Sequence, residues 1–419
     1  MMNSIVNIVN VSNLLDGNID GATNNMVEIG DKIFLLSPYN YTNYNIYTVK
    51  KVNKSKNRQL LNPDLIIYHK NCPDGTAAAW SVKKLGGGKC KSLPTPAGTD
   101  VDINEILTRK SIWYVDISPS YNFIIKLNDE ISKITLENQP KITIIDHHET
   151  FNSTIKKLVS NNKLFNLKWL TIYYDNKRSG CQLTFDYINL YTDYNNMFNK
   201  TELNDIITTS NNLICVNEII KDNDVKLLFD SRPWFINYIG ERDLWCFDSL
   251  LNCKAINTSL YANCSGLYTY KYFDTLNIYK NNELIEYMKK ITDQGLKIIE
   301  ENDKIINKFS NSAKHMKYID TNNTYNIWLI EVDQSGYQLR SEIGNFCTTK
   351  QFNDKTLPDF VVCALFTPEN NIWRFACRGA DKVNLSVFCA KFGGGGHPNA
   401  SGFELPSNKH YNTIFNDIN

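Results

Sequence analysis

The segment Ile142–Glu149 constrains the fold more than any other part of the chain. It reads I-T-I-I-D-H-H-E, an apolar, β-branched run followed directly by Asp146, His147 and His148. The run is typical of a buried strand, and a carboxylate with two imidazoles needs partners there, because burying unpaired charge is costly. Ligands of open α/β sheets bind beyond the carboxyl ends of the strands, so this segment predicts a metal-dependent catalytic site at such an edge.

Short strand-like runs alternate with helical segments from residue 64 onward. The runs Leu65–His69, Ile112–Asp116 and Ile142–Asp146 each end on a polar residue, and the helical stretches Thr76–Leu85 and Tyr121–Glu137 separate them. This alternation indicates right-handed βαβ units. We therefore expect an α/β fold with a parallel sheet covered on both faces.

At 419 residues the chain is too long for one ordinary core, so we expect several domains. Residues 1–62 form a short β-rich amino-terminal extension, and 63–282 form the main α/β domain with helical insertions. A connecting helix and linker follow at 283–324. The remainder, 325–419, is a smaller α/β carboxyl-terminal domain.

Periodicity within these domains predicts individual elements. Strands are expected in Val27–Pro38 and Tyr47–Val52 of the extension. Helices are expected at Leu183–Tyr191 and Leu203–Val216, and a long helix at Glu283–Phe309, where apolar residues recur at helical spacing.

Composition excludes several classes of protein. The net charge is only +1, from 45 basic and 44 acidic residues, so the chain lacks the overall excess of basic residues that is typical of proteins that bind long nucleic acids. Eleven cysteines without a C-x-x-C pair argue against a disulfide framework and fit a reducing compartment. The sequence has no secretory signal and no apolar stretch long enough to span a bilayer, so we expect a soluble cytoplasmic protein with no membrane partner.

Candidate metal ligands follow successive strand or loop ends. They are His69, Asp74, Asp116, Asp146, His147, His148 and Asp243. Carboxylates mixed with imidazoles suit Mn²⁺ or Fe²⁺. Simpler readings exist for single residues: Asp116 as a helix N-cap or turn residue, His69 as a loop histidine, and Asp243 as a partner of Arg242.

The glycine-rich segment 393–402 is the second strong signal. It reads G-G-G-G-H-P-N-A-S-G, and its successive glycines would let backbone N–H groups approach a phosphate. Upstream, Arg374 and Arg378 could clamp a phosphate or stack on a base. The alternatives are a flexible glycine turn and solvated strand arginines.

These motifs together resemble a known family. The D-H-H of 146–148, with the upstream H…C-P-D-G of 69–75, Asp116 and Asp243, resembles the DHH phosphoesterase superfamily. The segment 393–402 resembles the signature of the DHH-associated carboxyl-terminal domain. The resemblance runs from about Leu65 to Leu405 and implies a bilobed protein with its active site between the lobes.

The resemblance also implies a role for each residue. Asp116 would bridge two Mn²⁺ ions, with Mg²⁺ or another divalent ion as a substitute. His69, Asp74, His147 and Asp243 would be further metal ligands. His148 and Asp146 would be catalytic, with His148 facing the scissile phosphate. The substrate would be held by Arg378, Gly394, Gly395, Gly396 and His397.

The first motif departs from the usual pattern of this family. When Asp74 is aligned on the second expected aspartate, Cys72 occupies the place of the first, and His69 stands one position too close. Cys72 is then either a soft metal ligand, which would favour Zn²⁺, or a small buried filler.

The resemblance favours a phosphodiesterase or phosphatase that hydrolyses short oligonucleotides or small nucleotides to 5′-mononucleotides with a two-metal-activated water. Oligoribonucleotides, cyclic dinucleotides and 3′-phosphoadenosine 5′-phosphate all remain open as substrates. The rival functions are a polyphosphate hydrolase and an inactive nucleotide-binding module. Near-zero net charge disfavours the binding of long single strands. A homodimer is left open.

Overall fold

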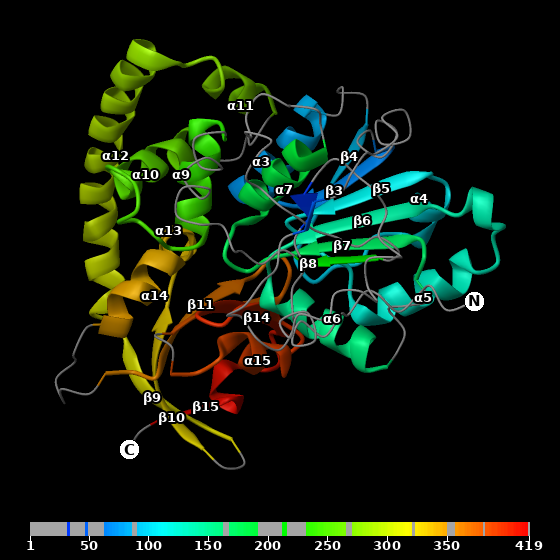
Figure 1. Ribbon diagram of the computed structural model, residues 1–419. Helices are drawn as coiled ribbons and strands as arrows, with labels where there is room; N and C mark the ends of the chain where they lie inside the picture. Colours follow the sequence, from blue (N-terminus) through cyan, green and yellow to red (C-terminus); the bar gives the residue numbers. More distant parts are fainter. Residues whose placement is uncertain are drawn as a thin grey trace. The chain divides into compact units, whose positions relative to one another are not determined.

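The computed structural model describes two compact units, unit 1 over Met1–Thr292 and unit 2 over Asp293–Asn419 (Figure 1). The residues it describes are 32–33, 47–48, 63–85, 90–161, 167–191, 212–215, 232–264, 270–320, 323–349, 357–379 and 382–417. Among these, no helix is both long enough and apolar enough to cross a membrane.

Unit 1 is built on a six-stranded sheet in which every neighbouring pair of strands is parallel. The strands, in spatial order, are β4 (Lys91–Thr95), β3 (Leu65–His69), β5 (Ser111–Val115), β6 (Lys141–Asp146), β7 (Leu170–Tyr174) and β8 (Asn212–Cys215). This confirms the parallel sheet that the alternating pattern predicts. Because the strands are parallel and in register, all their carboxyl ends lie at one edge.

Helices cover both faces of this sheet, as Figure 1 shows. One face carries α3 (Pro73–Leu85), α7 (Gly180–Tyr191), α9 (Trp234–Asp243) and α10 (Cys253–Cys264). The other carries α4 (Ile103–Leu107), α5 (Tyr121–Ile131) and α6 (Glu149–Ser160), and a short 3₁₀ turn follows at Leu136–Asn138. Alternate strand residues enter the two cores: Ile66 packs toward α3, and its neighbours Leu65 and Ile67 pack toward α5.

One predicted helix is a strand where the structure describes it. The sequence predicts a helix over Leu203–Val216, but Asn212–Cys215 pairs in parallel with β7 as strand β8. The apolar triplet Leu213–Cys215 satisfies the backbone groups of β7 that would otherwise lie unpaired at the edge, and this tertiary demand outweighs the local helical pattern. Residues 203–211 lie outside the described residues.

The amino-terminal extension is described at two places. Lys32–Ile33 (β1) and Tyr47–Thr48 (β2) pair as antiparallel strands. The other residues of the predicted strands Val27–Pro38 and Tyr47–Val52 lie outside the described part of the chain.

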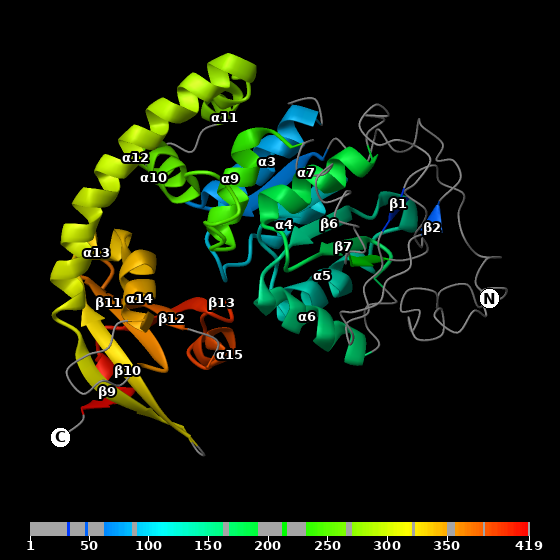
Figure 2. The ribbon, with the colours of Figure 1, turned by 60° about the vertical axis from the view of Figure 1, so that its left-hand side comes forward.

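A long helix joins the two units. After α11 (Tyr270–Leu276), helix α12 runs unbroken over Asn281–Ser310, close to the bounds expected from its periodicity (Figure 2). Its carboxyl-terminal residues Ile306 and Phe309 pack in unit 2.

Unit 2 has a seven-stranded mixed sheet. Its strands, in spatial order, are β13 (Gly395–His397), β14 (Ala400–Pro406), β12 (Ile372–Gly379), β11 (Phe360–Thr367), β10 (Thr324–Glu331), β9 (Lys314–Ile319) and β15 (Phe415–Asp417). β10 and β11 are parallel, and the other neighbouring pairs are antiparallel. One face packs on α13 (Gln334–Gln338), α14 (Arg340–Thr349) and the end of α12, and the other on α15 (Leu385–Ala390) and the 3₁₀ turn Tyr411–Thr413.

A buried ion network ties α7 to the segment that precedes α9. Asp186, on α7, accepts hydrogen bonds from Arg178 Nη1 at 2.6 Å and from Arg232 Nε and Nη2 at 2.8 and 2.6 Å. Arg178 Nε also donates to Asp175 at 2.8 Å. The carboxylates of Asp175 and Asp186 are at most 1% exposed, so the paired arginines, and not solvent, must stabilise their charges.

We predict that Asp186→Ala lowers the free energy of unfolding by about 3–5 kcal/mol, because it removes the buried carboxylate that pairs with Arg232 and with Arg178, of which Arg178 keeps Asp175. Urea denaturation followed by circular dichroism measures the change. Glu130→Ala is the matched control, since Glu130 pairs with Lys133 at 2.8 Å on the surface of the same unit and should contribute less than about 1 kcal/mol. Equal losses in the two variants would contradict a structural role for the buried network.

Candidate metal centre

The predicted ligands of unit 1 gather at the carboxyl edge of the parallel sheet. His69 ends β3, Asp116 follows β5, and the D-H-H segment begins on the last residue of β6. Asp74 lies in the first turn of α3, directly after the β3 loop. The sequence places Asp243 with these strand ends, but it is the last residue of helix α9, so a helix brings it to the edge.

Asp116 lies at the centre of this group. Its side chain is 1% exposed, with Oδ1 3.0 Å from His147 Nε2 and Oδ2 3.4 Å from His69 Nδ1. Its φ of 57° is in the left-handed region, which is uncommon for a residue other than glycine. The N–H of Asp116 donates to the carbonyl of Ile145 at 2.9 Å, which secures this backbone conformation. The two carboxylate oxygens thus face two different imidazoles.

Two glycines allow helices to approach Asp116. A Cβ at Gly180, the first residue of α7, would lie 2.4 Å from Asp116 Cβ and Oδ1. A Cβ at Gly75, in α3, would lie 3.0 Å from Asp116 Oδ2 and 2.7 Å from the carbonyl oxygen of His69. Any side chain at either position would push a helix away from the carboxylate.

The amino terminus of α7 holds Asp74 in place. The carboxylate accepts hydrogen bonds from Ser179 Oγ at 2.8 Å, from Gly180 N–H at 2.6 Å and from Cys181 N–H at 3.0 Å. These donors are among the backbone groups that a helix start leaves without intrahelical partners. Sequence reasoning missed Ser179 and Gly180, although a Ser-Gly pair before a helical segment is a recognisable helix-start signal.

Asp146 organises its own loop. Its Oδ1 accepts hydrogen bonds from the N–H groups of His147 and His148 at 2.8 and 3.3 Å and lies 2.7 Å from His148 Nδ1. Burial lowers the pKa of His148, but the neighbouring Asp146 carboxylate outweighs it, and the net shift is upward. Asp146 therefore orients the His148 ring.

The described residues of unit 1 form three groups whose ligand atoms lie within 4.8 Å of one another. They are His69, Cys72 and Asp116; Asp74, His147 and Asp243; and Asp116, Asp146, His147 and His148. The resemblance of the sequence to the DHH phosphoesterases is thus accompanied by a compact cluster of histidine and aspartate side chains.

The electrostatics of the cluster fit a bound cation. Burial, followed by the charge of Asp116, raises the pKa of both Asp74 and Asp243, although His147 opposes the shift. Burial lowers the pKa of His147, yet its hydrogen bond with Asp116 and the surrounding carboxylates raise it to about 10. Asp116 Oδ2 and Asp243 Oδ2 are buried and accept no hydrogen bond. Divalent ions would supply the positive charge that these oxygens lack.

The glycine-rich segment of unit 2 is a hairpin. Gly395–His397 pairs with Ala400–Pro406, and the Ser401 hydroxyl donates to the carbonyl of His397 at 2.7 Å. A Cβ at Gly394 would lie 2.0 Å from the carbonyl oxygen of Gly402, and Gly396 has a φ of 137°. Close packing of the hairpin therefore requires these two glycines. Whether the hairpin also holds a phosphate stays a prediction.

Arg378, on β12, points at helix α14. Its Nη2 donates to Ser341 Oγ at 2.6 Å, and a Cβ at Gly344 would lie 2.5 Å from Arg378 Cγ. Burial, together with the nearby charge of Arg340, lowers the pKa of Arg378. Arg340 lies 4.9 Å from the centre of the Tyr337 ring. Sequence reasoning missed Arg340, which lies far from the glycine-rich motif along the chain.

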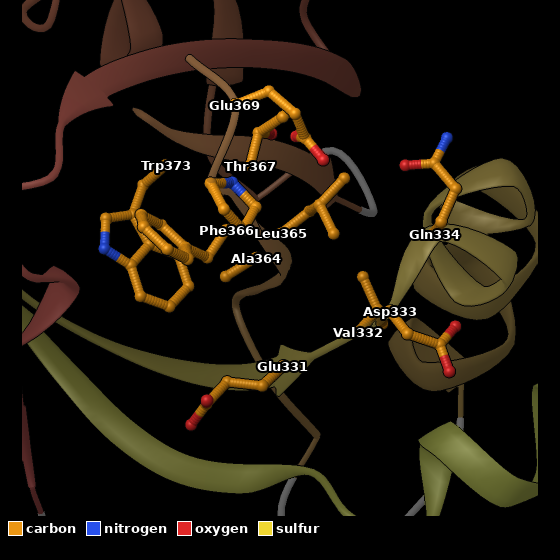
Figure 3. Close-up of a pocket in the computed structure, with 11 residues that line it drawn as sticks. Glu331, Val332, Asp333, Gln334, Ala364, Leu365, Phe366, Thr367, Glu369 and Trp373 are labelled. Carbon is orange, nitrogen blue, oxygen red and sulfur yellow. The ribbon is translucent and has the colours of Figure 1, made fainter. Parts of the chain in front are cut away.

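Figure 3 shows a separate cavity of about 340 Å³ in unit 2, at the carboxyl ends of β10 and β11. Glu331, Asp333 and Glu369 supply carboxylates, and Phe366 and Trp373 line one side with ring centroids 5.2 Å apart. No lysine or arginine is among its lining residues, so the cavity is poorly suited to a phosphate.

Comparisons with known proteins give distant similarities. No family model matches the chain. An uncharacterized protein of Acanthamoeba polyphaga mimivirus is 21% identical over 353 residues, which cover 81% of this chain and 66% of that protein. The chain thus spans just under two thirds of that relative's length.

Several solved structures are similar to the chain, among them three of different proteins. RecJ from Thermus thermophilus, in complex with Mn²⁺, is 11% identical with a TM-score of 0.42, over 85% of this chain and 52% of RecJ. The pGpG-specific phosphodiesterase PggH from Vibrio cholerae is 9% identical with a TM-score of 0.33, over 82% and 92%. An exopolyphosphatase-related protein from Bacteroides fragilis is 14% identical with a TM-score of 0.32, over 84% and 89%. The roles proposed below rest on the side-chain contacts of this chain.

We predict that Gly180→Ala weakens Mn²⁺ binding by about 10–100-fold, because the added methyl displaces Asp116 and the α7 amides that hold Asp74. Isothermal titration calorimetry with the metal-free protein measures the affinity. Gly379→Ala is the control: its Cβ would meet the Leu385 side chain at 3.2 Å and Phe360 Cβ at 3.8 Å, both in unit 2. If Gly180→Ala bound Mn²⁺ as tightly as the parent protein does, metal binding would not require the close approach of helix α7 to Asp116.

Proposed function

We propose that the chain is a divalent-metal-dependent phosphoesterase that hydrolyses short oligonucleotides or small nucleotides. The observation that carries this proposal is the buried Asp116 carboxylate, whose two oxygens face His147 at 3.0 Å and His69 at 3.4 Å. A carboxylate shared between two ligand groups is what a pair of divalent ions requires. Mn²⁺ suits the mixture of imidazole and carboxylate donors, and Mg²⁺ or another divalent ion is the alternative.

Each residue of the centre would have a distinct task. Asp116 would bridge two ions, with His69 on one side and with Asp74, His147 and Asp243 on the other. When bound, the ions would stabilise charge on the phosphoryl oxygens and lower the pKa of a water molecule. The first amides of α7 hold Asp74, and Gly180 of α7 and Gly75 of α3 lie against Asp116, so these two carboxylates need little rearrangement to bind metal.

His148 would act on the substrate. Asp146 Oδ1 lies 2.7 Å from His148 Nδ1 and fixes the orientation of the ring, and Nε2 would face a phosphoryl oxygen of the substrate. A hydrogen bond to that oxygen strengthens as negative charge builds up on it, which favours the transition state over the bound substrate.

Unit 2 would supply a grip on the nucleotide. Burial and the nearby charge of Arg340 lower the pKa of Arg378, whose Nη2 donates to Ser341 Oγ at 2.6 Å, and the two guanidinium groups would attract an anion. Tyr337, beside Arg340, offers an aromatic face for a base. With the hairpin glycines Gly394, Gly395 and Gly396 and with His397, these residues form the proposed binding surface.

An aromatic ring beside paired arginines favours a nucleotide over polyphosphate, which has no base to stack. A compact pair of charges also favours a small substrate over a long strand, which needs an extended basic groove. Polyphosphate hydrolysis remains the second candidate. An inactive nucleotide-binding module is the third, motivated by Cys72 at the usual aspartate position.

A substrate panel tests this proposal. Purified protein with Mn²⁺ should hydrolyse di- to pentaribonucleotides, cyclic dinucleotides or 3′-phosphoadenosine 5′-phosphate, and should leave polyphosphate and long single-stranded DNA largely intact. Asp116→Ala should reduce turnover of the best substrate to background while circular dichroism stays unchanged, because the bridging ligand is lost. Near-normal Mn²⁺-dependent turnover by Asp116→Ala would refute the bridging role, and turnover of polyphosphate alone would favour the second candidate.

The two histidines of the D-H-H segment should respond differently to metal. His147→Ala should raise the Mn²⁺ concentration needed for half-maximal activity by about 10–100-fold, since it removes a ligand. His148→Ala should lower kcat by about 10²–10³-fold at every Mn²⁺ concentration, since it removes a hydrogen bond to the phosphoryl group. Mn²⁺ titrations of the steady-state rate separate the two, and coincident curves would disprove this division of roles.

A further inference from the structure

The two ligand groups that share Asp116 differ in chemistry. Asp74, His147 and Asp243 offer only oxygen and nitrogen atoms. The group on the other side consists of His69, Cys72 and Asp116, whose ring nitrogen, Sγ and carboxylate oxygen lie within 4.8 Å of one another. The centre is therefore asymmetric, because one of its positions includes a thiol.

The loop that carries Cys72 is held in a defined position. The carbonyl oxygen of Cys72 accepts hydrogen bonds from Thr76 N–H at 3.0 Å and from Thr76 Oγ1 at 2.9 Å, at the start of α3. Asn71, immediately before it, has a φ of 57° and turns the chain back after β3. These contacts fix the backbone that aims the sulfur at His69 and Asp116.

The surroundings of the thiol favour a metal ligand over an apolar filler. Cys72 is only half-buried, and its sulfur lies beside an imidazole and a carboxylate. Asp116 Oδ2 is buried there, accepts no hydrogen bond and lies 3.4 Å from His69 Nδ1, which is longer than an ordinary hydrogen bond. The three ligand atoms lie within 4.8 Å of one another, a spacing that allows one cation to contact all three.

We propose that the His69–Cys72–Asp116 position selects a thiophilic divalent ion, with Zn²⁺, Fe²⁺ or Co²⁺ as the class, while the Asp74–His147–Asp243 position takes Mn²⁺ or Mg²⁺. This inference rests on the two-metal centre of the proposed function. A thiolate with an imidazole and a carboxylate is a donor set typical of zinc, whereas an oxygen-rich set with one imidazole suits the harder ions. The bridging carboxylate would then join two different metals.

Cobalt binding provides a test that does not depend on turnover. Metal-free protein titrated with Co²⁺ should develop a near-ultraviolet sulfur-to-cobalt charge-transfer absorption with a stoichiometry of one. Cys72→Ser and Cys72→Asp should lose that absorption while still binding cobalt. Cys90→Ser is the matched control, since Cys90 is also half-buried in unit 1 and should leave the absorption unchanged.

Metal competition measures the selectivity itself. Because Zn²⁺ binds most nitrogen and oxygen sites more tightly than Mn²⁺ does, the equilibrium dialysis uses Mn²⁺ in about 100-fold excess over Zn²⁺, and elemental analysis of the parent protein should then find one of each ion per chain. Cys72→Asp should shift the Zn²⁺ to Mn²⁺ ratio toward Mn²⁺ by at least about tenfold, because an oxygen ligand replaces the thiolate. Thermal unfolding of each variant with bound Mn²⁺ establishes that it is folded.

The outcomes separate this inference from the proposed function. Charge-transfer absorption that persists in Cys72→Ser, or a parent protein that takes two Mn²⁺ and no Zn²⁺ from the mixture, would overturn the inference even if the enzyme hydrolysed nucleotides. Absorption that is lost in the Cys72 variants and kept in Cys90→Ser would support the inference, even if every substrate in the panel were left intact.

Discussion

A single buried carboxylate, Asp116, sets the spacing of everything around it. Its left-handed backbone conformation turns the side chain into the space between His69 and His147, and the helix starts at Gly75 and Gly180 come close because neither has a side chain. A carboxylate that is only 1% exposed is poorly solvated, so its neighbours must supply positive charge. The rest of unit 1 can be understood as a scaffold that holds those neighbours.

Several carboxylates and imidazoles share one buried part of this scaffold. Asp74 and Asp243 lie close to Asp116. Burial raises the pKa of both residues, and repulsion by the Asp116 carboxylate raises it further. His147 offsets part of this charge. A cation bound there would offset this charge, and it would link metal binding to folding stability through the same side chains.

Support for the centre extends beyond the ligands. Asp186 joins Arg178 and Arg232, and through them the start of α7 and the segment leading to α9. Helix α7 holds Asp74 with its first amides, and helix α9 ends on Asp243. A packed ion network therefore fixes two helices whose ends form the site, which is how a rigid fold keeps ligands at working distances.

The sequence by itself determined the parallel sheet, because β-branched runs that alternate with helical stretches can bury their apolar surface in few other ways. Since polar residues end those runs, the sequence also placed His69, Asp116 and the D-H-H segment at one edge of the sheet. Local pattern could not show that Asn212–Cys215 pairs with β7, that a helix carries Asp243, or that Gly180 and Arg340 lie beside distant partners. Only the tertiary structure decided these, because each depends on contacts between segments far apart in the chain. For the same reason, the sequence left Cys72 open between filler and ligand, and folding brought its sulfur within 4.8 Å of a nitrogen of His69 and an oxygen of Asp116.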